Sequence, residues 1–242
     1  MRIQGSQNVL VLLNRFSIGY REGSQGILPY LEHLGVPHTT VDLATSPLPE
    51  DTGDYALIII AHRWLDPTMA RMDRAARRAL LAACAAGTGL VTFDTDLPSP
   101  AELGAHGRAR GTITAETITF GARRHFLTAC HTPGETLPLV GPLRLPLLAA
   151  TDASTLITAN GHPLVAAGRL GQGRVVQWAT TGWMHSGVLG PLAGLDDVLW
   201  RSLVWAARKP FVLRGLGPLV CMRVDDVAAT GSLWGQSPLY WV

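Results

Sequence analysis

The sequence is poor in the residues that build common catalytic and metal sites. Its 242 residues include three cysteines, Cys84, Cys130 and Cys221, which are odd in number and widely spaced. This pattern matches neither a disulfide framework nor a cysteine-based metal site. The last histidine is His185, and Lys209 is the only lysine. Any chemistry must therefore come mainly from carboxylates and from the few histidines.

Strong net charge and long apolar runs are also missing. The chain has 20 basic and 18 acidic residues, a formal charge of +2, which gives no reason to expect nucleic acid or a membrane as partner. No apolar run approaches the roughly 20 residues of a membrane span. The run at residues 9–13 is too short for the core of a signal peptide. We therefore expect a cytoplasmic protein.

Three continuous apolar runs stand out in the first half of the chain: Val9–Leu13, Tyr55–Ile60 and Leu90–Phe93. Strands of this kind suit a parallel sheet that is covered on both faces. Helical segments are expected between them, one over residues 25–34 and one capped by Asp66 that runs to about residue 86. The fold class predicted is α/β: a three-layer α/β/α sandwich with a mainly parallel, flavodoxin-like sheet in which the three runs are neighbours.

The second half of the chain is expected to hold shorter strands and a late helix. The turn Leu170-Gly-Gln-Gly173 predicts a β-hairpin insertion. A proline-rich stretch over residues 134–146 is expected to run extended, and a helix is expected over Asp196–Ala207. We predict one domain over residues 1–212 and a separate C-terminal tail, 213–242. The strands expected here span residues 112–120, 149–160, 162–168 and 174–178.

Polar side chains follow the predicted strands, at the sheet edge where open α/β folds bind ligands. Their mixture of carboxylate, imidazole, guanidinium and indole suits a small polar or sugar-like ligand. Asp94, His62 and His185 are the candidates for proton transfer. A structural role is open for each of them: Asp94 would then brace a turn or pair with Arg63. The predicted ligand-binding residues are Asn14, Arg15, His62, Arg63, Trp64, Asp94, Asp96, Trp183 and His185.

The order of the elements resembles a known superfamily. The residues that carry the resemblance are the strand at 55–60, the helix end Ala85-Ala-Gly-Thr-Gly89, the strand at 90–93 and the hairpin within 162–176. Together they resemble the class I glutamine amidotransferase-like superfamily, and more closely its trehalose-utilisation-type and β-galactosidase-trimerisation-type members. The resemblance covers roughly residues 9–210. It implies a flavodoxin-like fold, and its closer members are often not glutaminases.

The resemblance also implies where catalytic residues would stand. In catalytic members a cysteine nucleophile follows the strand that matches Leu90–Phe93, and here that place is taken by Asp94. The family's His-x-Glu would fall near residues 180–185, where His185 has no glutamate two positions later. A Cys–His glutaminase is disfavoured on both counts. The chain is expected to be a pseudoenzyme of this superfamily.

A second resemblance lies in the tail. Arg223-Val-Asp-Asp-Val227 resembles the opening motif of polysaccharide deacetylases, in which Asp225 would be the general base and Asp226 a metal ligand. That chemistry needs further histidine ligands, and none follows His185. We therefore expect no metal site and no cofactor in this chain, unless a deacetylase domain follows it.

Two functions stay open from the sequence. The first is a non-catalytic amidotransferase-like domain that binds a small polar or carbohydrate ligand or a neighbouring catalytic domain. The alternative is a carbohydrate-active hydrolase of deacetylase or glycosidase type that uses Asp94 or Asp96 with His62 as acid and base. A homo-oligomer or an adjoining domain remains open as a partner.

Overall fold

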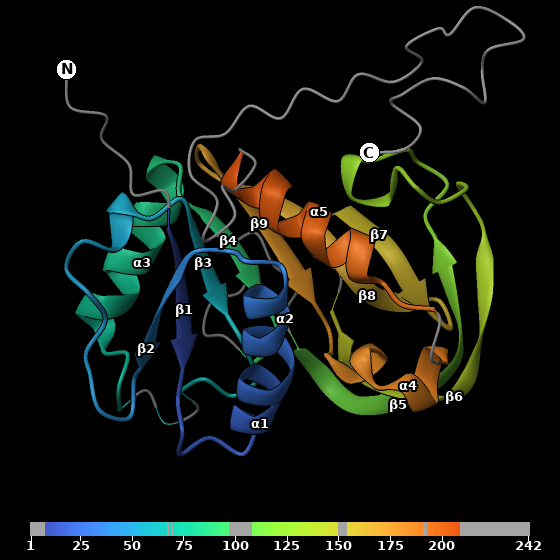
Figure 1. Ribbon diagram of the computed structural model, residues 1–242, viewed down its shortest axis with the longest axis horizontal. Helices are drawn as coiled ribbons and strands as arrows, with labels where there is room; N and C mark the ends of the chain where they lie inside the picture. The colour runs from blue at the N-terminus through green and yellow to red at the C-terminus, as the bar shows by residue number, and fades with distance from the viewer. Residues whose placement is uncertain are drawn as a thin grey trace, which may run out of the picture.

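The computed structural model describes residues 8–66, 68, 70–96, 108–149, 154–190 and 193–208. A nine-stranded sheet with the order β2-β1-β3-β4-β9-β8-β7-β5-β6 forms its centre (Figure 1). The three apolar runs form the adjacent parallel strands β1, β3 and β4, as predicted. The five strands of the parallel half are β1 (Val9–Leu13), β2 (His38–Asp42), β3 (Leu57–Ile60), β4 (Gly89–Thr92) and β9 (Gly173–Trp178).

The other half of the sheet is antiparallel. The predicted hairpin forms between β8 and β9, closing at the Leu170–Gly173 pair. Asn160 and Gly161, both at positive φ (46° and 80°), make the tight turn between β7 and β8, as Asn-Gly pairs favour. Because β9 pairs in parallel with β4 and antiparallel with β8, it joins the two halves. The antiparallel strands are β5 (Arg108–Phe120), β6 (Thr136–Leu148), β7 (Ser154–Ala159) and β8 (His162–Leu170).

The helices agree with the sequence predictions at the end of the described chain and differ near its start. The late helix spans the predicted residues. The first helical segment begins at Tyr20, earlier than expected, and continues through a wide turn, η1 (Gly23–Ile27). The α-helices are α1 (Tyr20–Glu22), α2 (Leu28–His33), α3 (Arg74–Ala86), α4 (Ser186–Leu189) and α5 (Asp196–Ala207).

The helix expected from Asp66 begins later than the sequence suggested. Asp73 is the residue that caps α3, accepting a hydrogen bond of 2.8 Å from the backbone N–H of Ala76. Asp66 instead accepts from the backbone N–H groups of residues 70–72, in an irregular turn before the helix. Both aspartates act as caps, but only the second one starts a helix, because the first holds its donors in a turn.

Burial on both faces of the sheet confirms the three-layer sandwich. Val9 and Val11 of β1 belong to a core shared with α2 and α5, whereas Leu10 and Leu12 belong to a core shared with α3. Successive side chains of a strand point to opposite faces, so the continuous apolar run fills both cores. Figure 1 shows α1, α2 and α5 on one face of the sheet and α3 on the other.

Two sequence predictions concern residues outside the described ranges. The boundary at residue 212 and the tail 213–242, with its Asp225–Asp226 pair, fall outside the described residues. Across the described ranges, no helix is both long and apolar enough to cross a membrane.

Candidate functional site

Three of the predicted site residues meet at one edge of the sheet. Asn14, His62 and Asp94 follow β1, β3 and β4 closely, and parallel strands end at a common edge. We call the hydrogen-bonded set of these three side chains and the backbone of residues 63–65 the strand-end network. All three side chains are buried. The structure brings these three side chains to adjoining loops, and their contacts decide what they can do.

Asp94 is the anchor of the strand-end network. Its Oδ1 accepts hydrogen bonds from the backbone N–H groups of Trp64 (3.0 Å) and Asp96 (2.9 Å), and its Oδ2 accepts from Leu65 N–H (2.9 Å). Asp94 is only 2% exposed, and burial raises the pKa of its carboxyl group to about 6 although the three donors act in the opposite direction. Asp94 therefore uses its oxygens to hold the loop after β3.

The loop that Asp94 holds carries backbone strain. Trp64 has a φ of 54°, in the left-handed region that is uncommon for a bulky residue. Such a conformation persists only where neighbouring contacts fix it, and the bond from Trp64 N–H to Asp94 is one such contact. Its side chain also lies under a guanidinium, that of Arg63, at 4.8 Å from the ring centre. The sequence offered no sign of this conformation.

His62 is fully buried and uses both ring nitrogens inside the protein. Nε2 accepts from the backbone N–H of Asn14 at 3.0 Å, so Nδ1 carries the proton and donates to the carbonyl oxygen of Arg63 at 2.8 Å. Burial lowers the pKa of His62, which favours the neutral ring. This imidazole joins the loops after β1 and β3 and has no free nitrogen to exchange a proton with a ligand.

Asn14 closes the network from the side of β1. Its Nδ2 donates to the carbonyl oxygen of Leu65 at 2.8 Å, and its Oδ1 accepts from the N–H of Phe16 at 3.1 Å. The loops after β1 and β3 also touch directly, since a Cβ at Gly19 would collide with the carbonyl oxygen of Arg63. A side chain whose amide nitrogen and oxygen are both hydrogen-bonded to loop backbone positions those loops, and it offers little to a ligand.

The charged members of the predicted rim pair with other residues. Arg15 forms an ion pair with Asp42, and Arg63 forms one with Glu22 at 2.7 Å. The suggested pairing of Arg63 with Asp94 is not among the contacts of either group. Asp96 is half-buried, and its backbone N–H donates to the Asp94 side chain of the network. These arginines lie at the rim, where solvent reaches both of them.

Trp183 and His185, predicted to join the rim from the late loop, lie in different settings. Trp183 is 2% exposed and packs in the core against Trp178, with ring centres 5.2 Å apart. Among the described residues, the indole N–H of neither tryptophan has a hydrogen-bond partner. His185 is exposed just before α4. The structure brings neither residue into the strand-end network.

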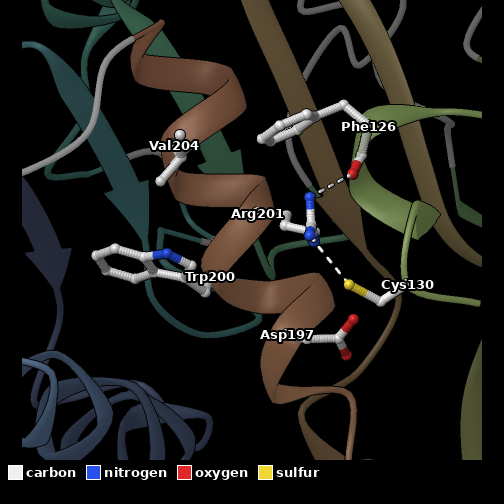
Figure 2. A pocket seen from close by; sticks show the side chains of 6 residues that line it. All are labelled: Phe126, Cys130, Asp197, Trp200, Arg201 and Val204. Atoms are coloured by element: carbon white, nitrogen blue, oxygen red, sulfur yellow. Dashed lines mark hydrogen bonds between the residues drawn. The ribbon is translucent and has the colours of Figure 1, made fainter. Parts of the chain in front are cut away.

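A cavity that the sequence did not predict lies on the outer side of α5. Its volume is about 250 Å³, and it opens between α5 and the 3₁₀ turn η4 (Phe126–Thr128) (Figure 2). Four lining residues come from α5 at the spacing i, i+3, i+4 and i+7, so a second stripe on that helix was visible in the sequence. We call this the α5 cavity; its lining residues are Phe126, Cys130, Asp197, Trp200, Arg201 and Val204.

Metal binding finds no support in the described part of the chain. There, no group of three or more histidine, cysteine, aspartate or glutamate side chains is placed to hold a metal ion. The aspartate pair of the tail, Asp225 and Asp226, lies outside this part, so its predicted role stays a prediction.

Comparison with known proteins identifies the fold. No protein-family model matches the chain, and neither does any curated protein. Among solved structures, a ThuA-like protein from Bacteroides uniformis has a TM-score of 0.58 at 12% identity, over 84% of this chain and 92% of that chain. A chain of PurLQS from Thermotoga maritima has a TM-score of 0.50 at 15% identity, over 82% of this chain and 98% of that chain.

A longer protein contains the same fold as one part. A β-galactosidase from Bacillus circulans has a TM-score of 0.50 at 10% identity, over 84% of this chain and 30% of that chain. With the ThuA-like and PurLQS structures, it confirms the class I glutamine amidotransferase-like fold predicted from the sequence. At these identities the likeness extends to the fold alone.

Proposed function

We propose that this chain is a non-catalytic amidotransferase-like domain, which works by binding rather than by turnover. The observation that carries the proposal is the strand-end network. By the resemblance, Asp94 takes the place of the superfamily's nucleophile, and all three of the hydrogen bonds that its carboxyl group accepts come from the backbone. A group held in this way supports the architecture of the sheet edge, and its removal would disturb folding before chemistry.

The residues around Asp94 also lack the arrangement that proton transfer needs. A general base must reach the proton it abstracts, directly or through one water molecule. His62 is fully buried with both nitrogens engaged, and Asp94 is nearly inaccessible. A water molecule or substrate that reached either group would have to break bonds that hold the loop after β3.

Binding to a neighbouring catalytic domain, or to a small polar or carbohydrate ligand, is the role we assign to the domain. The β-galactosidase supports the first of these roles, since there the same fold is part of a much longer chain. The α5 cavity supports the second, since aromatic and aliphatic walls with a few polar groups are typical of small-molecule sites.

One observation favours the alternative, a carbohydrate-active hydrolase. Burial raises the pKa of Asp94 to about 6, and a carboxyl group perturbed in this way is a feature of many general acids. In this case Asp94 would donate a proton near neutral pH, after the loop that covers it had moved. The two functions differ in what the substitution Asp94→Asn does to turnover.

The test is a turnover screen with matched variants. Wild type, Asp94→Asn and His62→Gln are incubated with glutamine, with aryl glycosides and with aryl and acetyl esters. We expect no product above the level of a heat-inactivated sample, and no difference among the three proteins. Turnover that disappears in Asp94→Asn, while circular dichroism shows a folded protein, would establish the hydrolase instead.

A further inference from the structure

The α5 cavity contains the one cysteine that is exposed among the described residues. Cys130 is free and exposed, whereas Cys84 is free and fully buried on the inner face of α3. Burial raises the pKa of the Cys84 thiol to about 12, so that thiol is inert near neutral pH. The described residues therefore hold one exposed and one buried cysteine, and the buried one serves as an internal control for the exposed one.

A guanidinium group is held against the sulfur of Cys130. Nη2 of Arg201 donates to Sγ of Cys130 at 3.0 Å, and Nη1 donates to the carbonyl oxygen of Phe126 at 3.3 Å (Figure 2). The guanidinium carbon also lies 5.1 Å from the centre of the Phe126 ring. Three contacts fix this positive charge beside the sulfur, at the wall of a cavity. Exposed cysteines in such positive surroundings are the ones that exchange with disulfides.

A carboxylate completes the polar part of the cavity. Asp197 lies one helical turn from Arg201 on α5, and its oxygens are 3.1 and 3.3 Å from Nε2 of His131. His131 in turn stacks on Phe120, with ring centres 3.9 Å apart. The cavity therefore offers one positive and one negative group, both anchored, in a space of about 250 Å³. A small ligand that carries both an ammonium and a carboxylate group matches this pair.

We propose that the α5 cavity is a thiol-exchange site, at which Cys130 forms a mixed disulfide with a small thiol that carries both ammonium and carboxylate groups, such as glutathione. The ligand's carboxylate contacts Arg201, and its ammonium group contacts Asp197. This site lies outside the strand-end network. The proposed function also draws on this cavity for a small ligand, but the exchange inferred here is argued from the contacts of Cys130, Arg201 and Asp197 and holds whether or not the domain binds a carbohydrate or a neighbouring domain.

The exchange needs no reactant beyond the disulfide form of the ligand. The Cys130 sulfur attacks one sulfur of the disulfide, and a new S–S bond forms as the old one breaks. The departing sulfur takes the electron pair of the old bond and the proton that Cys130 gives up. Cys130 is oxidised, the departing half is reduced, and an excess of the free thiol reverses the reaction.

The experiment follows adduct formation by intact mass and peptide mapping. All proteins carry Cys221→Ser, because Cys221 lies outside the described residues, so only Cys84 and Cys130 can react. Each protein is mixed with glutathione disulfide (one ammonium and two carboxylates on each arm), hydroxyethyl disulfide (neutral) or cystamine (cationic). The same reactions with the urea-unfolded chain give the intrinsic rate of each disulfide.

We expect one glutathionyl adduct on folded protein, at Cys130 and not at Cys84. Relative to the unfolded chain, Cys130 should prefer glutathione disulfide over cystamine by about tenfold, the effect of one favourable charge contact. Arg201→Gln should remove this preference, whereas Arg201→Lys should retain part of it. Asp197→Asn should slow the reaction of Cys130 with glutathione disulfide but leave the rate with hydroxyethyl disulfide unchanged.

Two results would overturn the proposal. The first concerns the ratio of the rate with glutathione disulfide to the rate with hydroxyethyl disulfide. The proposal fails if this ratio at Cys130 is no higher in the folded protein than in the unfolded chain. The other is a preference that survives Arg201→Gln. Thermal melts of each variant show whether the fold persists, and Arg201→Lys keeps the test decisive if Arg201→Gln unfolds.

Discussion

The strand-end network and the α5 cavity contain the same three kinds of charged or titratable group, in different circumstances. In the network they are Asp94, His62 and the neighbouring Arg63; at the cavity they are Asp197 and Arg201 of the lining, with His131 bonded to Asp197. In the strand-end network the aspartate is 2% exposed and accepts from three backbone amides, whereas Asp197 has a side chain that is 37% exposed and faces His131. At the sheet edge the side chains hold loops in place, whereas Asp197 and Arg201 line an open cavity. A side chain at the edge of the sheet where such folds bind ligands is therefore not necessarily free to contact a ligand or to transfer a proton.

The largest difference between the two regions should come from their aspartates. Asp94→Ala leaves three N–H groups without their acceptor, one of them buried and two part-buried, and we expect a loss of about 3 kcal/mol in the free energy of unfolding. Asp197→Ala removes a partly exposed group, and its loss should stay below about 1 kcal/mol. Urea unfolding of the two variants beside wild type measures both values. Equal losses would show that the strand-end network does not brace the fold.

A pH effect on stability should appear in the strand-end network. Because burial raises the pKa of Asp94 to about 6, the folded protein keeps a proton between pH 4 and 6 that the unfolded chain has released. Stability from this group is therefore fully present below about pH 4 and falls as pH rises to about 6, by on the order of 2–3 kcal/mol.

The measurement is the difference in free energy of unfolding between wild type and Asp94→Asn, taken at intervals from pH 4 to pH 7. This subtraction removes the titration of all groups that the two proteins share. The difference should shrink as pH rises. A difference that grows instead would mean that the three amide donors outweigh burial, and that the pKa of Asp94 is depressed.

The histidines should give a smaller contrast. His62→Ala removes a buried ring with two hydrogen bonds, and we expect a loss of about 2 kcal/mol. His131→Ala removes a ring stacked on Phe120 near the surface, with a loss of about 1 kcal/mol. Thermal and urea unfolding test the order. A larger loss of stability in His131→Ala than in His62→Ala would show that the histidine beside the cavity contributes more to the fold.

The arginines should give the smallest difference in stability between the two regions. Here the substitution at the α5 cavity should cost more than the one at the sheet edge. Arg15 pairs with Asp42 in solvent, so Arg15→Ala should leave the melting temperature unchanged within error. Arg201 packs on the Phe126 ring and bonds its carbonyl oxygen, so Arg201→Ala should cost about 1 kcal/mol. A melting curve in low and high salt distinguishes the two. A clear loss in Arg15→Ala that salt abolishes would show that the exposed pair does stabilise the fold.

The sequence alone was sufficient for the order and neighbours of the central strands. Continuous apolar runs such as Val9–Leu13 are buried on both faces, and this requires a covered parallel sheet whatever the rest of the chain does. The late helix and the β8–β9 hairpin followed from equally local signals, a helical period and a glycine turn. The start of α3 did not, because Asp66 and Asp73 are both good caps and their competition is settled by which backbone donors each one reaches.

For the candidate site, the sequence determined which residues gather at the sheet edge, and the tertiary structure decided whether they are free. Strand-end positions are fixed by the topology, so Asn14, His62 and Asp94 could be placed together. Whether Asp94 faces a ligand or a backbone amide depends on a loop 29 and 30 residues earlier in the chain, which folds over it with Trp64 in a left-handed conformation. The α5 cavity likewise required Cys130 and Arg201, 71 residues apart, to meet. Contacts between segments so distant in sequence leave no periodic signal, and only the folded chain shows them.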